Sequence, residues 1–461
     1  MTAPAKEKKK PSFIYAASTF VLVLAVVLGG YYFLGIGLEV MFLFSWLLVF
    51  PACMKLGCSY GELEQGAFEF IKKGMGPVLL SLVVGGTIST WIGAGTVPAI
   101  IYYGLCYLKP GNFLLVAFVL SLALSLACGT AWGTMGTIGI AMFAVGQSFQ
   151  VPAALTVGAI FSGAFLGETC TPMSSTSNAC AAITGVPIMK HCEKAGKLAA
   201  VSGIIAAALY LLLGRQFAGS ALPEDYIAGL CTQLTANFEI DWYAFIPMIV
   251  LFALILRNVP AVFSMLISAI AAGFVAVFHQ GMDLQSVVSA FWNGFVVTGE
   301  EGALLAALLS HGGVKSMFNT ICTMIFTFGI IGAFNTVGLM EAIINPVFRN
   351  TRSPIRLTAT TQLVAIVGNM LGTNTFSILM AGSLMTKAYE QAGVEKHNLS
   401  RDITAASTVL CPLIPWNVSG LYITGLFGIG SLAAVPFAFC AFLTPLFSYV
   451  FIARETNRKS P

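Results

Sequence analysis

Long apolar runs recur along almost the whole chain and are separated by short polar segments. Their lengths reach, or nearly reach, the ~20 residues that a helix needs to cross about 30 Å of hydrocarbon. The clearest runs are Phe13–Leu34, Leu38–Met54, Pro77–Leu108, Leu198–Leu213, Trp242–Leu256, Ala261–Phe278 and Leu432–Ile452. This pattern predicts an all-α polytopic protein that crosses a cell (inner or plasma) membrane many times.

The composition agrees with this prediction. Of the 461 residues, 57% are hydrophobic and only 9% are charged, and the mean hydropathy is +0.87. A soluble domain carries about 25% charged residues. The chain therefore cannot cover a water-facing surface, and we expect a lipid bilayer around it. The net charge of +4 is small, and we expect no nucleic-acid partner.

Lysine and arginine residues gather in certain loops, which the positive-inside rule assigns to the cytoplasm. These loops are centred on Lys72–Lys73, 190–197, 349–356 and 387–401. The basic segment 1–12 has no obvious cleavage site, so we interpret it as a cytoplasmic tail and not as a removed signal peptide. Residues 454–461 form a second cytoplasmic tail. The segment 214–240, which is poor in basic residues, is predicted to be an extracytoplasmic linker.

Short segments of the first half reappear in the same order in the second half. The matches pair LEQGAFEFIKKG (63–74) with LQSVVSAFWNGF (284–295), WIGAGTVPAIIYYG (91–104) with IIGAFNTVGLMEAII (330–344), CGTAWGTMGTIGIAM (128–142) with LGTNTFSILMAG (371–382), and ETCTPMSSTSN (168–178) with TVLCPLIPWNV (408–418). The first copy starts at a cytoplasmic end and the second starts after the outward linker. The sequence therefore predicts two inverted-topology repeats, 13–213 and 241–453, which is the usual construction of secondary transporters.

Polar and helix-breaking residues interrupt two long apolar segments in each predicted repeat. Residues 112–147 and 357–386 each start and end on one side, which predicts re-entrant helical hairpins with tips near 128–134 and 372–375. The crossings that follow the hairpins are interrupted at ETCTPMSS (168–175) and CPLIPWN (411–417). Non-helical backbone at membrane depth is tolerated only where protein or a water-filled cavity satisfies it. We therefore predict a discontinuous transmembrane helix in each repeat.

The tips and breaks supply the candidate binding site for substrate and ions. Its predicted members are Glu168, Thr171, Ser174, Ser175, Thr176, Asn178, Thr130, Thr134, Thr373, Asn374, Thr375, Trp416 and Asn417. Buried membrane acids are functional by default, so Glu168 is expected to bind Na⁺ or H⁺. Alternatively, it caps the unwound backbone. The sodium-ligand candidates are Glu168, Ser175, Asn178 and Asn417. The hydroxyls and amides of the breaks also have an alternative, structural role. Instead of binding Na⁺ or substrate, they would form hydrogen bonds with the backbone groups freed at the breaks and would bridge helices.

Other charged residues receive secondary roles. Glu39 and Glu341 are interpreted as structural or as secondary titrating groups, and Glu300 and Glu301 as interfacial residues. Two amphipathic stretches suit interfacial arms that join a moving unit to a fixed scaffold. These arms are Glu62–Lys73 and Asp283–Phe295. Self-association of such a scaffold would make the protein a homodimer, which the sequence leaves open.

The sequence shows no arrangement of residues that is typical of an enzyme active site. The eleven Cys residues are scattered, and no Cys/His spacing indicates a metal or redox site. The four His residues fall in predicted loops, so no base is expected beside a nucleophile at membrane depth. We therefore expect no enzyme activity and no cofactor, with Na⁺ and H⁺ as coupling ions.

Three motifs carry a resemblance to a known family. They are G-[DE]-x-x-[ST]-P-x-S-x-[ST]-[ST]-N at 167–178, LSR at 399–401 and PLIPWN at 412–417. With these motifs the chain resembles the NhaC family of Na⁺/H⁺ antiporters within the ion-transporter superfamily. The resemblance covers essentially the whole chain. It implies a secondary active antiporter, coupled to Na⁺, H⁺ or both, that works by alternating access. Relatives in that family include sodium/proton antiporters, malate/lactate exchangers and presumed amino-acid carriers.

This chain departs from the family pattern at three acidic positions. The family typically reads G-D-K-x-S-P-x-S-D-T-T at the first break, where this chain has Ser175 in place of the second acid. The family also carries two acids in a stretch like LEDSGT, where this chain has ITAAST (403–408). Glu168 is the acid that remains. The alternative function is therefore Na⁺-coupled transport or exchange of a small organic solute, either an amino acid, a monocarboxylate or a dicarboxylate.

Overall fold

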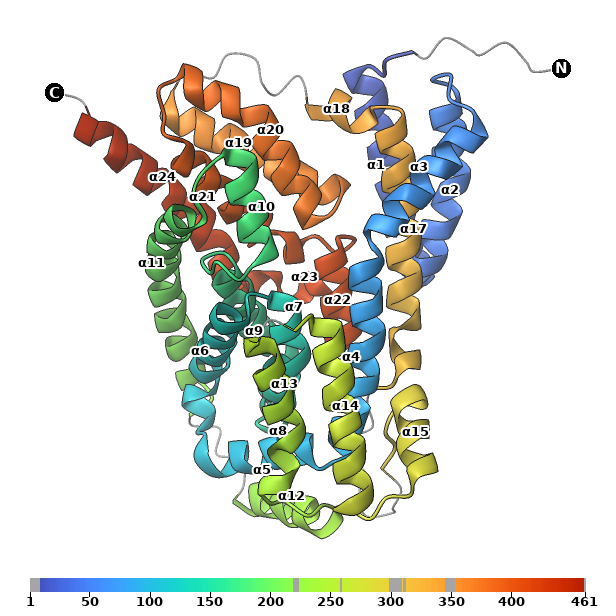
Figure 1. Cartoon of the computed structure of the whole chain (residues 1–461), viewed down its shortest axis with the longest axis vertical. Helices are drawn as coiled ribbons and strands as arrows, with labels where there is room; N and C mark the ends of the chain where they lie inside the picture. The colour runs from blue at the N-terminus through green and yellow to red at the C-terminus, as the bar shows by residue number, and fades with distance from the viewer. Residues whose placement is uncertain are drawn as a thin grey trace.

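The computed structural model describes residues 9–218, 224–257, 259–297, 309, 312–344 and 353–459. Every regular element in these residues is helical, and Figure 1 shows many of the helices running along the long axis of the molecule. Six described helices are long and apolar enough to cross a membrane, and three bent pairs pass the same test. The predicted all-α membrane architecture is confirmed. Glu300 and Glu301 lie outside the described residues.

The first repeat contains the predicted hairpin and broken helix. Its elements are α1 (Phe13–Leu34), α2 (Leu38–Met54), α3 (Tyr60–Lys73), α4 (Met75–Gly93), α5 (Thr96–Tyr107), α6 (Pro110–Cys128), α7 (Ala131–Thr134), a π-helical turn (Met135–Gly139), α8 (Ile140–Ser148), α9 (Ala153–Glu168), α10 (Ser175–Thr184) and α11 (Ile188–Arg215). Helix α6 is the first arm of the hairpin, and α7, the π-turn and α8 form the second arm. The break between α9 and α10 falls at 169–174, inside the predicted interruption.

The second repeat follows the same order. Its elements are α13 (Ile246–Leu256), α14 (Ala261–Phe278), α15 (Leu284–Asn293), α17 (Phe318–Thr336), α18 (Leu339–Ile344), α19 (Pro354–Leu371), α20 (Asn374–Gln391), α21 (Lys396–Ser407), α22 (Val418–Phe427), α23 (Ser431–Ala434) and α24 (Phe439–Lys459). Helices α19 and α20 form the hairpin. Helices α21 and α22 form the broken helix, and the pair is bent by 42°. The predicted linker contains a helix of its own, α12 (Glu224–Asn237).

Both predicted amphipathic segments are helices, and each packs against the opposite repeat. In the first repeat, α3 lies against α17, where Gly66 and Gly332 bring the two backbones close together. In the second repeat, α15 lies against α4, where a side chain at Gly86 would collide with the Phe291 ring. These exchanged contacts bind the two repeats into one scaffold of α2, α3, α4, α14, α15 and α17.

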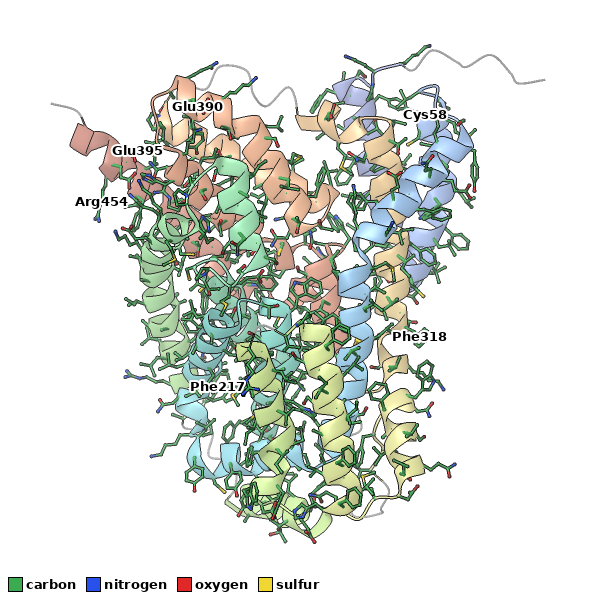
Figure 2. The ribbon with its side chains drawn as sticks, viewed as in Figure 1. Cys58, Phe217, Phe318, Glu390, Glu395 and Arg454 are labelled. Atoms are coloured by element: carbon green, nitrogen blue, oxygen red, sulfur yellow. The ribbon has the colours of Figure 1, made fainter. Side chains whose placement is uncertain are left out.

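The hairpins and broken helices form a second packing group. Helix α9 packs on α6, α10 packs on α20 and α21, and α11 packs on α24. At one end of the molecule, Figure 2 shows Cys58 together with Glu390, Glu395 and Arg454. Helix α12 lies at the opposite end (Figure 1).

The structure corrects several local predictions. The apolar run Pro77–Leu108 is two helices, because Gly95 adopts a left-handed φ of 77° and starts a new helix. Arg401 was predicted in a basic loop but is buried inside α21 with 1% exposure. His191 and His397 were also predicted in loops but are buried within α11 and α21. Apolar neighbours on other helices enclose these positions, which a loop prediction based on local polarity cannot anticipate.

Small residues allow α6 and α9 to pack with their backbones almost touching. A Cβ atom at Gly163 would lie 2.3 Å from the carbonyl oxygen of Phe118 and 2.9 Å from the backbone nitrogen of Leu122. At Gly167, one turn later, it would lie 2.7 Å from the carbonyl oxygen of Leu122. Close approach through small residues at a four-residue spacing is a common way to associate helices in a membrane. This contact holds the end of α9 against the first hairpin.

We expect Gly163→Ala to lower the free energy of unfolding by about 1–3 kcal/mol, since the added methyl group forces two backbones apart. Gly29→Ala is the matched control, because Gly29 lies in α1 with open space around it. Alanine is also the better helix former, so the control should be neutral or slightly stabilising. Thermal unfolding of the two purified variants in detergent measures the difference. Equal melting temperatures would contradict the packing described for α6 and α9.

Candidate functional site

Glu168 is the last residue of α9 and lies where the first hairpin meets the break. Its side chain is only 4% exposed. One carboxylate oxygen accepts a hydrogen bond from the backbone N–H of Ala131 at 3.0 Å, and the other accepts one from the Thr176 hydroxyl at 2.9 Å. Ala131 and Thr176 each belong to the first turn of a helix. The carboxylate therefore lies near the positive ends of two helix dipoles.

Within the described part of the chain, no charged side chain balances this carboxylate. Among the residues that the structure describes, no Lys, Arg or His forms an ion pair with Glu168. A buried charge is normally paired, bound to a metal ion or neutralised by a proton. The described part of the chain offers Glu168 only hydrogen bonds. A carboxylate in such a place is the kind of group at which a proton or a cation can bind.

The other polar residues near this carboxylate divide into a buried set and an exposed set. Ser174 is buried and caps α10 by accepting a hydrogen bond from the backbone N–H of Ser177. Thr171 is also buried and accepts one from the backbone N–H of Met173 at 3.4 Å. By contrast, Ser175 and Asn178 are exposed. The amide nitrogen of Asn178 donates to the carbonyls of two break residues, so its side chain also stabilises the unwound backbone.

The tip of the first hairpin stands directly against the break. Gly129 ends α6 in the left-handed region with φ 70°, and Thr130 then caps α7. A Cβ atom at Gly129 would lie 2.6 Å from the backbone of Met173. Thr134 donates to the carbonyl of Thr130 at 2.8 Å. Both predicted threonines of this tip therefore form local hydrogen bonds that shape the turn.

The second hairpin and the second break form a similar arrangement. Thr373 caps α20 by accepting from the backbone N–H of Phe376, and Thr375 beside it is exposed. Asn417 caps α22, and its amide nitrogen donates to carbonyls at the hairpin tip at 2.8 and 3.0 Å. Trp416 donates its ring N–H to the carbonyl of Met370 at 2.8 Å. Asn374 donates to the Thr408 hydroxyl at 3.4 Å.

Aromatic contacts join the two halves of the site. The ring of Trp132 in α7 lies 4.6 Å from that of Tyr422 in α22, measured between centroids. The Tyr422 hydroxyl donates to the carbonyl of Trp132 at 3.1 Å. A Cβ atom at Gly136 would lie 2.8 Å from the same hydroxyl oxygen. The first hairpin of one repeat and the broken helix of the other therefore meet in a single region, as the predicted two-repeat site requires.

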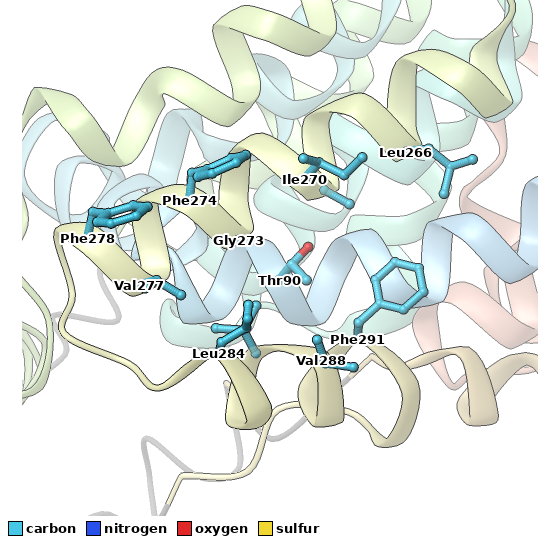
Figure 3. Close-up of a pocket in the computed structure, with 12 residues that line it drawn as sticks. Thr90, Leu266, Ile270, Gly273, Phe274, Val277, Phe278, Leu284, Val288 and Phe291 are labelled. Atoms are coloured by element: carbon cyan, nitrogen blue, oxygen red, sulfur yellow. The ribbon is translucent and has the colours of Figure 1, made fainter.

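A pocket of about 500 Å³ between α4, α14 and α15 lies apart from this region. Figure 3 shows that the rings of Phe274, Phe278 and Phe291 and several aliphatic side chains surround it. Thr90 is its one polar side chain. An apolar cavity of this kind cannot stabilise a cation. The hairpin tips and helix breaks remain the candidate site.

The chain can be compared with known proteins now that this geometry is established. The model of the Na+/H+ antiporter family matches residues 164–453, which include the first break, the second hairpin and the second break. The chain belongs to the Na+/H+ antiporter family. The predicted resemblance to NhaC antiporters is thereby confirmed.

Three relatives illustrate the range of this family. The malate-2H(+)/Na(+)-lactate antiporter of Bacillus subtilis is 29% identical and aligns over 95% of this chain and 94% of that protein. The Na(+)/H(+) antiporter NhaC of the same species is 26% identical, over 96% of this chain and 98% of that one. The arginine/ornithine antiporter ArcD of Halobacterium salinarum is 27% identical, over 95% and 91%.

A buried charge cluster in this antiporter was missed by the sequence analysis. Arg401 donates to one carboxylate oxygen of Asp402 through Nε at 3.0 Å and through Nη2 at 2.8 Å. The other oxygen accepts from Thr358 at 2.6 Å and from Tyr389 at 2.9 Å. Ser448 of α24 adds a further hydrogen bond. The cluster ties α19, α20, α21 and α24 together, so its first role is to make the second hairpin and the broken helix one unit.

The LSR motif (399–401) is the signal that could have located this cluster. Sequence reasoning used it only for the family resemblance and counted Arg401 as a loop charge, because basic residues usually mark the cytoplasmic ends of helices. The neighbouring Ser400 also has a structural partner, since its hydroxyl lies 2.6 Å from Nδ1 of His191. Two guanidinium nitrogens of Arg401 donate to Asp402, whereas the third, Nη1, is buried without a hydrogen-bond partner. Asp402 therefore balances the positive charge of Arg401 inside α21, before the second break begins.

Arg401→Met should lower the free energy of unfolding by roughly 3–5 kcal/mol, since it leaves the buried Asp402 without its counter-charge. The double variant Arg401→Met/Asp402→Asn removes both charges and should recover much of that loss. Thermal unfolding and the yield of monodisperse protein in detergent compare the two variants. A double variant that is no more stable than the single variant would show that the ion pair does not balance Asp402.

Proposed function

We propose that this antiporter exchanges Na⁺ for H⁺ at Glu168, which binds one ion or the other as the site opens alternately to each side of the cell membrane. The observation that carries the proposal is a carboxylate that is 4% exposed and has no cationic side chain paired with it among the described residues. Such a group needs a proton or a cation to balance its charge. Competition between the two at one carboxylate is the simplest basis for antiport.

The hydrogen bonds around Glu168 support this role. The carboxylate connects three elements, α9, α7 and α10, through Ala131 and Thr176. A change in its occupant therefore acts directly on the contact between the first hairpin and the break. Ser175 and Asn178 lie at the exposed side of the break and are proposed to supply further oxygen ligands to Na⁺. Free carbonyls and hydroxyls at helix breaks are common sodium ligands in transporters.

The moving part is proposed to consist of the hairpins and broken helices of both repeats, 13–213 and 241–453. These elements pack on one another through α6 and α9 and through α10, α20 and α21. The scaffold would contain α3 and α15, each of which packs on the other repeat. Self-association through the scaffold would give a homodimer. We propose that both chain ends, 1–12 and 454–461, face the cytoplasm, with the linker 214–240 outside.

Glu168→Gln should abolish Na⁺-driven proton movement, because the amide can neither carry a proton nor balance a cation. The assay uses purified protein in liposomes that contain a pH-sensitive dye, and it starts with a pulse of external Na⁺. Glu69→Gln is the matched control, since Glu69 is an exposed acid of α3 and its loss should leave the rate unchanged. Full activity in Glu168→Gln would overturn the assignment. If the wild-type protein shows no Na⁺-driven proton movement, simple Na⁺/H⁺ exchange is excluded.

A second function, in which an organic solute takes part in the exchange, is favoured by two relatives and by the composition of the breaks. The relatives are the malate/lactate and arginine/ornithine antiporters. The breaks at 169–174 and 408–417 present hydroxyls, amides and carbonyls but contain no Lys or Arg. A dicarboxylate would leave two negative charges to be balanced there. A neutral amino acid or a monocarboxylate therefore suits the site better.

If this second function operates, the same liposomes should take up labelled lactate or a zwitterionic amino acid under a Na⁺ gradient, and malate much more slowly. The physical reason is that neither break contains a Lys or Arg residue, and the charge of Arg401, earlier in α21, is already balanced by Asp402. Uptake of malate at the same rate would contradict this reasoning. Proton movement without uptake of any organic solute would leave Na⁺/H⁺ exchange as the function.

A further inference from the structure

The second hairpin contains two buried side-chain oxygens that have no hydrogen-bond partner. They are Oδ1 of Asn369, at the end of α19, and Oδ1 of Asn374, at the start of α20. Asn369 has no exposed surface at all. A buried acceptor without a partner costs about 1–3 kcal/mol. Each one in a native protein therefore requires an explanation, such as a bound water or ion.

Both asparagines reach the same short stretch of α21 through their amide nitrogens. Asn369 donates to the carbonyl of Ser407 at 2.7 Å and to that of Ala406 at 3.3 Å. Asn374 donates to the hydroxyl of Thr408, the next residue along. Asn417 holds the start of α22 against this hairpin through the carbonyls of Asn369 and Gly372. The two unpartnered oxygens therefore belong to one small region between the hairpin tip and the second break.

This region occupies the place in the second repeat that Glu168 occupies in the first. Aligning the two breaks on Pro172 and Pro412 pairs Glu168 with Thr408. Aligning the hairpin segments GTAWGT (129–134) and GTNTFS (372–377) pairs Ala131 with Asn374. Ala131 donates to Glu168, and Asn374 donates to Thr408. The two contacts are equivalent, but only the first one involves a carboxylate.

The local electrostatics favour a cation at the second position. Helix α21 ends at Ser407, and the C-terminal end of a helix carries partial negative charge. Oxygen atoms of two amides and one hydroxyl gather beside it, and these neutral groups suit Na⁺ in transporters. Asp402 lies one and a half turns earlier in α21, but both of its oxygens are occupied by Arg401, Thr358, Tyr389 and Ser448.

We propose that Asn369, Asn374 and Thr408 form a second sodium site that carries no titratable group. The proposal rests on the function assigned to Glu168 and extends it. Sodium at the first site competes with protons, whereas sodium at the second site does not. The number of Na⁺ ions carried is therefore not tied to the number of protons, and a second Na⁺ is available to drive an organic solute.

The test measures binding of radiolabelled Na⁺ to purified protein in detergent, at about pH 6 and about pH 8.5. The amides and the hydroxyl of the second site do not titrate in this range. The background is Glu168→Gln, which removes the titratable site. We expect saturable Na⁺ binding to remain in this variant with the same affinity at both pH values. Binding in wild-type protein should contain an additional component that grows with pH.

Two variants in the Glu168→Gln background identify the ligands. Thr408→Val keeps the shape but removes the hydroxyl, and it should weaken the remaining Na⁺ binding roughly tenfold. Asn374→Asp introduces a carboxylate that can bind either Na⁺ or H⁺, so Na⁺ binding should become stronger and should rise with pH. Thr386→Val is the control, because Thr386 lies further along α20 and its hydroxyl donates to the carbonyl of Gly382 within the same helix. The Na⁺ affinity of this control should be unchanged. Melting temperatures and monodispersity are recorded for every variant.

Each outcome decides between the two proposals. No Na⁺ binding in Glu168→Gln, with pH-dependent binding in the wild type, would overturn the second site and leave the role of Glu168 intact. If the Na⁺ affinity that remains in Glu168→Gln is changed by neither Thr408→Val nor Asn374→Asp, the ion binds elsewhere, and this result would also overturn the second site. Binding in the wild type that does not change with pH would overturn the role of Glu168 while leaving the second site to be judged by its own variants.

Discussion

The arrangement of this protein depends on one constraint, which is that a membrane interior offers no water to polar groups. Glu168 and the unwound backbone at 169–174 therefore need partners within the protein. The first hairpin supplies the N–H of Ala131, and the start of α10 supplies the hydroxyls of Thr176 and Ser177. The hairpin, the break and the carboxylate are in this sense one unit. Loss of any member leaves the others with unsatisfied groups.

The same constraint applies to the second repeat, but its solution is different. There the partners are neutral amides and hydroxyls, with Asn417 and Trp416 binding the carbonyls of the hairpin. Arg401 and Asp402 lie earlier in α21, outside the break, and bind each other through Nε and Nη2 of Arg401. The duplicated architecture is thus symmetric in backbone but asymmetric in charge. Among the described residues, a carboxylate takes part in the hydrogen bonds of the first break only, and we propose that the two breaks bind ions differently on the basis of this asymmetry.

Close packing gives these parts their positions. Gly163 and Gly167 let α9 lie almost in contact with α6, and Gly66 and Gly332 do the same for α3 and α17. The scaffold helices exchange partners between repeats, whereas the hairpins and broken helices pack mainly on one another. A division into two packing groups is the mechanical condition for one group to move against the other. The contact between Trp132 and Tyr422 crosses the two repeats near the helix breaks.

Local patterns were sufficient for the membrane class, the two repeats, the hairpins and the breaks, because lipid imposes a strong and simple rule on every exposed residue. The family resemblance was equally local, since it rests on contiguous motifs. Tertiary structure alone decided which polar groups meet. It buried Arg401 beside Asp402 and left Asn369 and Asn374 with unpartnered oxygens. These contacts join residues from different helices, and their partners depend on three-dimensional packing that no local pattern in the sequence contains.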